Sequence, residues 1–293
     1  MIKIDHGISR RHFVLGSLSL ACCWALSGRA WAQVVGRGLT KNQDPNFYLS
    51  QKGDLLKEFS QVNTGAQKYL TSLYGPEAAG AISIAAATQF QALIPHLPFV
   101  GGVQNPNTPF LIQAGWYIAF YQAMQAHGKT AAAAGKIMYD LVVAEYTRLP
   151  QDEARRRGAL MFSAPELEKR RDYCRRTQQR QYPGDWVATF IPGDGQTFDF
   201  GYDYAECGAL KFFGSQGAAA MTPYFCIADF PRSRALGTGL ARTRTLAFGD
   251  DRCNFRYRQG RPVNQDWSTE IPQIRTPSPL RGERAGVRGG FLS

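Results

Sequence analysis

FDFGYDYAECGAL, residues 198–210, marks the point at which a predicted β-strand gives way to a helix. Aromatic residues alternate with small or acidic ones as far as Tyr204, which is the period of a strand with one buried face. The segment from Glu206 to Gly217 then reads as a short helix that the glycine closes. Glu206 and Cys207 stand side by side at this junction, so the stretch also raises the question of a functional pair.

The sequence on either side of this stretch extends the same pattern. DWVATFI, residues 185–191, predicts a strand that a Pro-Gly-Asp-Gly turn joins to residues 197–204. Residues 222–237 read as a helix that is kinked or broken near Pro231. Residues 239–260 predict a hairpin in which Cys253, Phe255 and Tyr257 share one strand face.

The upstream half of the chain is predicted to be helical because apolar residues recur there at helical spacing. A loop rich in proline, glycine and asparagine separates the second of these helices from the third. The sequence therefore predicts an α+β fold with an N-terminal helical half packed on a mainly antiparallel sheet with inserted helices, over residues 54–270. The expected helices are 54–73, 76–93, about 109–126, about 130–148, and one that starts near residue 164.

The first 32 residues are typical of an export signal. Arg10 and Arg11 precede a short apolar run, and Ala30-Trp31-Ala32 supplies small residues where a signal peptidase reads. The paired arginines resemble a twin-arginine signal, so we expect the export machinery of that type as a partner, cleavage after Ala32 and a periplasmic location. The alternative is a membrane-anchored N-terminus. Residues 33–53 are predicted to be a linker, and no later stretch reads as apolar for long enough to insert stably in a membrane after cleavage.

Charge is concentrated at the two ends of the chain. The formal net charge is +11, of which residues 1–32 and the tail at 271–293 contribute +3 each, leaving +5 for the body. The tail is rich in proline, glycine and arginine without an apolar period, and we expect it to be disordered. Residues 154–158 and 168–176 are basic but interleaved with acids, which indicates solvated helix faces. The sequence therefore predicts no nucleic-acid partner.

Three motifs make the chain recognisable as a relative of a known family. They are YAEC at 204–207, MTPYFCIAD at 221–229 and GTGLARTRTLAFGDDRCNFRYR at 237–258. In these motifs the chain resembles the L-2-amino-thiazoline-4-carboxylic acid hydrolase family, and the resemblance covers roughly residues 54–258. The resemblance implies that the substrate is a small molecule with a thiazoline ring. It also implies that water opens this ring to give an N-carbamoyl cysteine.

Such a reaction needs a general acid–base group, and Glu206 is the first candidate for it. In a pocket lined by Phe198, Phe200 and Tyr204, desolvation would raise the pKa of this carboxyl toward neutrality. The alternative is a glutamate that only complements the helix dipole. Asp229 is a second acid–base candidate, or a residue that caps a turn.

Cys207 has three readings that the sequence leaves open. It is a nucleophile near a helix N-terminus, a buried or disulfide-bonded cysteine, or a metal ligand together with Cys226, Cys253 and Asp229. Four cysteines follow the signal, and they allow three complete disulfide pairings. Because no Cys-x-x-Cys pair is present, we predict neither a metal nor another cofactor.

The substrate carboxylate is expected to be held by arginine, whose planar fork fits a carboxylate. Arg242 and Arg256, on neighbouring hairpin strands, are the candidates, although exposed strand arginines are common. His96, in a loop, and Tyr204 complete the predicted binding residues. No phosphate loop, dinucleotide fingerprint or Gly-x-Ser-x-Gly motif is present. We therefore expect an exported hydrolase, with a non-catalytic periplasmic binding protein on the same fold as the alternative.

Overall fold

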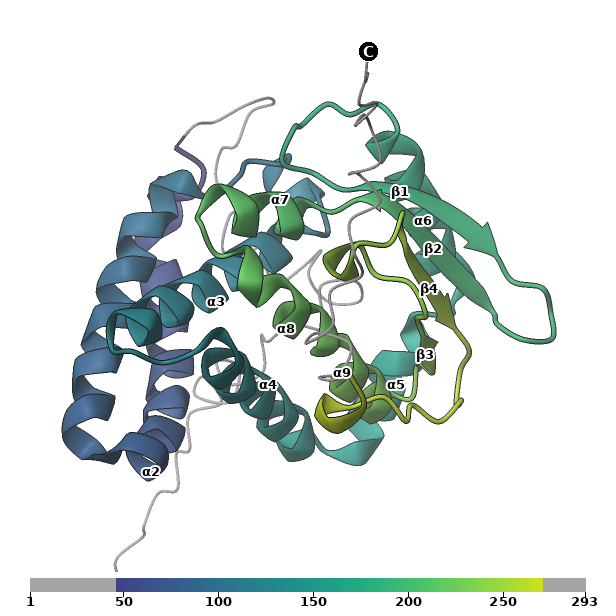
Figure 1. The fold of residues 1–293 in the computed structure, drawn as a ribbon. Helices are drawn as coiled ribbons and strands as arrows, with labels where there is room; N and C mark the ends of the chain where they lie inside the picture. The colour runs from purple at the N-terminus through teal and green to yellow at the C-terminus, as the bar shows by residue number, and fades with distance from the viewer. Residues whose placement is uncertain (1–45, 271–293) are drawn as a thin grey trace, which may run out of the picture.

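The structure is a computed structural model that describes residues 46–270. The predicted signal at 1–32, its cleavage site after Ala32, most of the predicted linker and the tail at 271–293 lie outside the described residues. At the described end of the linker, Phe47 and Tyr48 are buried in the core. The longer helices precede the sheet along the chain, and three short helices within residues 208–236 come between its second and third strands (Figure 1).

Helix α2 (Lys52–Leu93) is a hairpin of two helical segments rather than one rod. Gly75 interrupts it with non-helical backbone angles (φ 83°, ψ 164°), and Pro76 begins the second segment. Glycine accepts a positive φ without a steric penalty, and proline at the start of a helix loses no hydrogen bond. The two segments run back along each other, so that Phe59 stacks on Phe90 with ring centroids 4.6 Å apart.

One stretch of the described chain, Leu49–His96, is long and apolar enough to cross a membrane by length and composition alone. The expectation that no segment after the signal meets this test is therefore wrong. Its most apolar window has a mean hydropathy of 1.2. However, the stretch reverses direction at Gly75, and apolar residues of both segments, including Leu70 and Ile82, pack in the core.

Four helices follow: α3 (Thr108–Ala126), α4 (Ala131–Arg148), α5 (Gln151–Leu160) and α6 (Ala164–Thr177). Helix α3 is buried on almost every side, as expected for a helix whose residues are apolar all round. Pro109 lies in its first turn, as the sequence predicts. Thr130 caps α4 by accepting a hydrogen bond from the backbone amide of Ala133 at 3.1 Å.

The sheet is antiparallel, with strand order β1-β2-β4-β3. Side chains alternate between its two faces: Phe200 and Tyr202 are buried beneath the helices, whereas Asp203 lies on the outer face. Cys253, Phe255 and Tyr257 share the inner face, which confirms that part of the hairpin prediction. The strands are β1 (Val187–Pro192), β2 (Phe200–Glu206), β3 (Leu240–Ala241) and β4 (Cys253–Tyr257).

Three short helices fill the interval between β2 and β3: α7 (Gly208–Ser215), α8 (Thr222–Ile227) and α9 (Asp229–Leu236). The predicted break near Pro231 falls at Ala228, between α8 and α9. Proline has no amide hydrogen to give to the carbonyl of Ile227, so the helical ladder stops there and restarts at Asp229. The prediction of an α+β fold with N-terminal helices and a mainly antiparallel sheet is confirmed.

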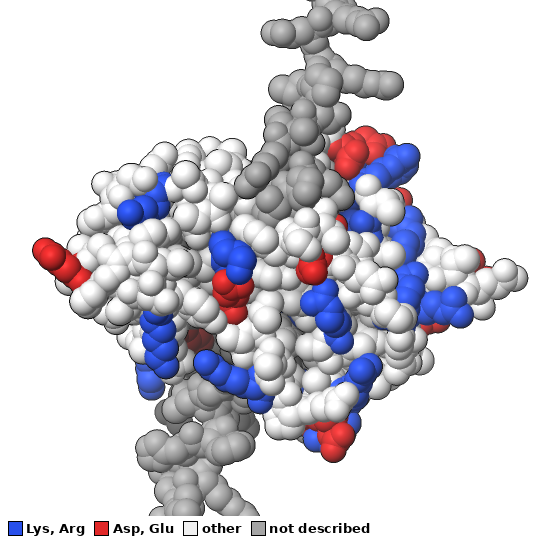
Figure 2. Space-filling view, turned by 60° about the horizontal axis from the view of Figure 1, so that its bottom comes forward, with Lys and Arg blue, Asp and Glu red and all other residues white. Residues whose placement is uncertain are grey.

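The basic segment at 168–176 is not solvated on every side, contrary to expectation. One face of α6 packs on the sheet, because Arg170, Tyr173 and Thr177 recur at helical spacing and are buried. Several of its other charged side chains pair along the helix surface, as Arg171 does with Glu168. On the face drawn in Figure 2, basic and acidic side chains are scattered among uncharged ones rather than gathered into one block.

A matched pair of helical glycines tests how tightly α4 packs on α8. A Cβ added at Gly135 would lie 2.3 Å from the ring of Tyr224, whereas one added at Gly80 would meet no atom within 4 Å. We expect Gly135→Ala to lower the free energy of unfolding by about 1–3 kcal/mol through overpacking. Gly80→Ala should raise it by up to about 1 kcal/mol through helix propensity. Urea unfolding measures both, and equal effects would contradict the packing described.

Candidate active site

A cavity of about 140 Å³ lies between the inner face of the sheet and helices α3, α6, α8 and α9. Most of its wall is aromatic or aliphatic, so a bound ligand would be largely shielded from water. The charged side chains of its wall are Asp229, Arg232, Arg242 and Arg170. The remaining lining residues are Asn107, Phe110, Met161, Trp186, Tyr202, Tyr204, Cys207, Ala209, Phe225, Cys226, Ser233, Leu236, Thr238, Cys253, Phe255 and Tyr257.

An ion pair between Asp229 and Arg242 stands in this wall. Nη1 of Arg242 donates to Oδ2 of Asp229 at 2.8 Å, and Nη2 donates to the carbonyl of Cys226 at 3.0 Å. The Arg242 side chain is 1% exposed and lies against the rings of Phe230 and Phe255. Burial is the largest single influence on the pKa of Arg242 and lowers it, but the Asp229 carboxylate together with the sulfur atoms of Cys226 and Cys253 raises that pKa above its usual value. Arg242 therefore holds Asp229 in place.

Arg232 is a second cation beside Asp229, and it is not among the site residues predicted from the sequence. Its Nη1 lies 3.4 Å from Oδ1 of Asp229, one turn along α9, and its guanidinium lies over the ring of Phe110. Unlike Arg242, it donates no hydrogen bond other than the one to Asp229 among the described residues. The spacing Asp-x-x-Arg at 229–232 was the signal that could have found it, because residues three apart share a helix face.

Two glycines and a serine set the path of the chain from α9 to Arg242. Gly237 ends α9 with φ +67°, and at Gly239 a Cβ would lie 1.9 Å from the carbonyl oxygen of Arg258. Only glycine fits both requirements. The hydroxyl of Ser233 then accepts from the amide of Leu240 at 2.9 Å, which fixes the start of β3. Arg242 follows two residues later and points into the wall.

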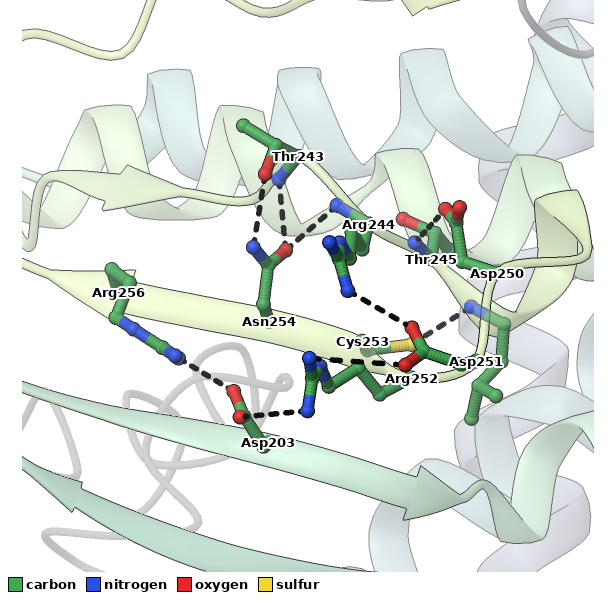
Figure 3. Close-up of polar contacts among 11 residues, drawn as sticks. Asp203, Thr243, Arg244, Thr245, Asp250, Asp251, Arg252, Cys253, Asn254 and Arg256 are labelled. Carbon is green, nitrogen blue, oxygen red and sulfur yellow. Dashed lines mark hydrogen bonds and ion pairs between the residues drawn. The ribbon is translucent and has the colours of Figure 1, made fainter.

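The motif after Arg242 braces the loop that follows it (Figure 3). The side-chain oxygen of Asn254 accepts from the amides of Thr243 and Arg244, at 3.0 and 2.7 Å. Asp250 accepts from the amide of Thr245 at 2.7 Å, and the sulfur of Cys253 accepts from the amide of Leu246 at 3.2 Å. Asp250 and Asn254 thus have structural roles in this loop. The two strands of the predicted hairpin are joined not by a short turn but by an eleven-residue connection between β3 and β4.

Glu206 does not line the cavity, although the alternation of β2 places it on the same face as Tyr204. The pairing of β2 with β1 shifts between Val187 and Ala188, which lie opposite Glu206 and Tyr204, so one residue of β2 is bulged. The bulge turns Glu206 to the surface, where it pairs with Arg180 and Lys211. The aromatic pocket expected around Glu206 is therefore not formed, and its catalytic role stays a prediction.

Arg256 and His96 also lie away from the cavity. Arg256 is on the outer face of β4, where its Nη1 lies 2.8 Å from Oδ1 of Asp203 (Figure 3). His96 ends a short 3-10 helix and is exposed. Tyr204 does line the cavity, and its ring meets that of Phe255 edge to face at 5.4 Å. Among the predicted site residues, Cys207, Asp229, Arg242 and Tyr204 come together.

The four cysteines of the described chain are free thiols, so the disulfide reading does not hold there. Cys207, Cys226 and Cys253 line the cavity, but no group of three or more His, Cys, Asp or Glu among the described residues could hold a metal ion. Burial raises the pKa of Cys207 to about 11, which outweighs hydrogen bonds from the start of α7. Burial likewise raises the pKa of Cys226 and Cys253. These thiols are therefore protonated at neutral pH.

The comparisons with known proteins identify the family. The family model described as L-2-amino-thiazoline-4-carboxylic acid hydrolase matches residues 109–257. The chain belongs to this family. The match spans α3 to β4 and so includes every charged residue of the cavity wall. No curated protein and no solved structure matches the chain.

The protonation of the cavity thiols is open to a direct test. Because the pKa of Cys207 is about 11, roughly one side chain in ten thousand is ionised at pH 7. We expect alkylation by iodoacetamide, followed by peptide mass spectrometry, to rise about tenfold per pH unit up to pH 10. The urea-unfolded protein, as control, should level off near the ordinary pKa of cysteine. An inflection below pH 8 in the folded protein would restore Cys207 as an activated nucleophile.

Proposed function

We propose that the protein hydrolyses a small cyclic amidine acid of the thiazoline type in the cavity beside Asp229. The observation that carries the proposal is the meeting of one carboxylate and two arginines in a cavity whose wall is mostly apolar. The family name supports a hydrolase, and the ring of 2-amino-thiazoline-4-carboxylate supplies a cationic amidine and an anionic carboxylate. These two charges match Asp229 and Arg232.

In this mechanism Asp229 is the general base. It accepts a proton from water while the water oxygen bonds to the ring carbon between nitrogen and sulfur. The bond from that carbon to sulfur then breaks as the carbon–oxygen double bond forms, and the hydroxyl proton leaves to solvent. Asp229 returns its proton to the departing sulfur. One water is consumed, and the product is N-carbamoyl-L-cysteine.

The other residues of the wall orient these groups. Arg232, which has unused donors and lines the cavity, holds the substrate carboxylate as a fork. Arg242 positions Asp229 and does not touch the substrate, because both of its terminal nitrogens already donate within the protein. The aromatic walls exclude bulk water, which strengthens every charge interaction inside. Water is the nucleophile here, since the thiols are protonated.

Substitution of Asp229 tests this assignment. We expect Asp229→Asn to lower kcat by about a hundredfold to ten-thousandfold, the range for loss of a general base. Product thiol released from the thiazoline acid measures the rate. Because the asparagine variant leaves Arg242 without its carboxylate, Asp229→Glu serves as a folded companion that keeps the charge and misplaces it. Asp203→Asn, on the outer sheet face, is the matched control. Full activity of Asp229→Asn would refute the proposal.

Glu206→Gln tests whether the general base is Asp229, as proposed here, or Glu206, as the sequence predicted. Since Glu206 lies at the surface with Arg180 and Lys211, we expect kcat and KM to stay within about twofold of wild type, as for surface changes away from a site. Loss of turnover in Glu206→Gln with retained turnover in Asp229→Glu would return the acid–base role to Glu206. If the thiazoline acid binds and is recovered intact from wild type, the protein is instead the binding protein considered above.

We further propose that the protein is exported to the periplasm by its twin-arginine-type signal. The motivation is the order of paired arginines, apolar run and Ala-x-Ala site in residues 1–32. Sequencing of the mature N-terminus should begin at Gln33, and Arg10→Lys/Arg11→Lys should leave the precursor in the cytoplasm. An unprocessed N-terminus in the wild-type periplasmic fraction would contradict the cleavage site.

A further inference from the structure

A second and larger cavity adjoins the first. It has a volume of about 450 Å³ and lies among the first segment of α2, α3, α4 and the α8–α9 junction. Four residues line both cavities: Phe110, Phe225, Asp229 and Arg232. The charged pair at the centre of the proposed reaction is therefore a wall common to two chambers, and we call the larger one the outer chamber.

The outer chamber reaches from the protein surface to this shared wall. Gln61, Thr64, Lys68 and Arg148 line it and are exposed, so it opens to solvent between α2 and α4. Its deeper walls are apolar, which suits a ligand with a hydrocarbon portion. The apolar side chains of these walls are Trp116, Tyr117, Met138, Leu141 and Val142.

Buried polar groups in the outer chamber lack partners. Gln113 is 5% exposed and its side-chain amide makes no hydrogen bond with any described residue, although it lines the chamber. The indole nitrogen of Trp116 and Nε of Arg232 are buried without a partner among the described residues. A buried polar group without a partner destabilises the protein. Of these groups, the Gln113 amide faces the chamber, and a ligand with an amide or a similar polar group in its middle would pair with it.

The mouth of the outer chamber is positively charged. Lys68 and Arg148 come from α2 and α4, and their side chains form no ion pair or hydrogen bond with the described residues. The acids that line the chamber are Glu145 and Asp229, and Asp229 is already held by Arg242. The lining thus has an excess of basic groups at its exposed end, which favours an anionic group there.

We propose that the outer chamber binds the tail of an elongated substrate, an acid with a cyclic amidine head, an apolar middle containing an amide, and a terminal carboxylate. The identity of the head rests on the proposed function. The head occupies the inner cavity beside Asp229, and the carbonyl of its amide takes the place of the free carboxylate on Arg232. The apolar middle lies along Trp116 and Leu141, and the terminal carboxylate meets Lys68 and Arg148. The natural substrate is then larger than the bare thiazoline acid.

Three inert ligands test this inference by calorimetry on the mature protein. The first is aminothiazole carboxylate, an aromatic analogue that water does not open. The second is its amide with ε-aminocaproate, and the third is the same amide with a neutral carboxamide end. We expect the second to bind at least about tenfold tighter than the first, since each buried methylene adds about 0.8 kcal/mol. The third should bind between them.

Reversing the charges of Lys68 and Arg148 measures how much the terminal carboxylate contributes to binding. In Lys68→Glu/Arg148→Glu, the second ligand should bind more weakly than the third, because the introduced glutamates repel its terminal carboxylate, while binding of the first should be unchanged. The matched control is Lys57→Glu/Arg258→Glu, which changes net charge equally at exposed positions that line neither cavity. In this control the second ligand should keep its advantage.

Three results would overturn the inference: the plain acid binding as tightly as its extended amide, the two double variants behaving alike, or no ligand binding at all. A failure of the proposed function would give a different set of results from a failure of this inference. In that case the wild-type protein leaves the thiazoline acid intact, while the preference for the extended ligand and its dependence on Lys68 and Arg148 persist.

Discussion

The ion pair between Asp229 and Arg242 is the interaction on which the rest of the site depends. A guanidinium that is 1% exposed requires an opposite charge within hydrogen-bond distance, because an unpaired buried charge is strongly destabilising. Two of the three motifs that carry the family resemblance, residues 221–229 and 237–258, meet at this pair. Because the helix is broken before Pro231, Asp229 is the first residue of α9. Gly237, Gly239 and the loop that Asn254 holds by hydrogen bonds fix the position of Arg242.

The interactions of Asp229, Arg232 and Arg242 are strong because the cavity wall around them is mostly uncharged. Aromatic rings from the sheet and from α3 and α8 surround Asp229, and the cavity thiols stay protonated because burial raises their pKa. In such surroundings a carboxylate and a guanidinium act over short distances with little screening. Asp229 also lies, with Arg232, in the wall shared with the outer chamber, so this one carboxylate connects the proposed chemistry with substrate length.

The sequence predicted the parts of the site that follow a regular period. Alternation in β2 and β4 placed Tyr204 and Phe255 on the cavity face, and the family motifs pointed to Asp229 and Arg242. Prediction from the sequence was wrong where the strand alternation is interrupted and where a charged side chain is buried. The bulge that turns Glu206 outward is a change of pairing register, which single-strand alternation does not encode. Arg170 was read as solvated because composition does not reveal which helix face packs on the sheet.

The most direct measurement is a crystal structure of the protein with the inert aminothiazole carboxylate bound. Our account predicts the ring in the inner cavity, its amino group hydrogen-bonded to Asp229 and its carboxylate on Arg232, with Arg242 still bound to Asp229. A ligand seated instead against Glu206 on the surface, or one that leaves Asp229 and Arg232 without contact, would contradict it.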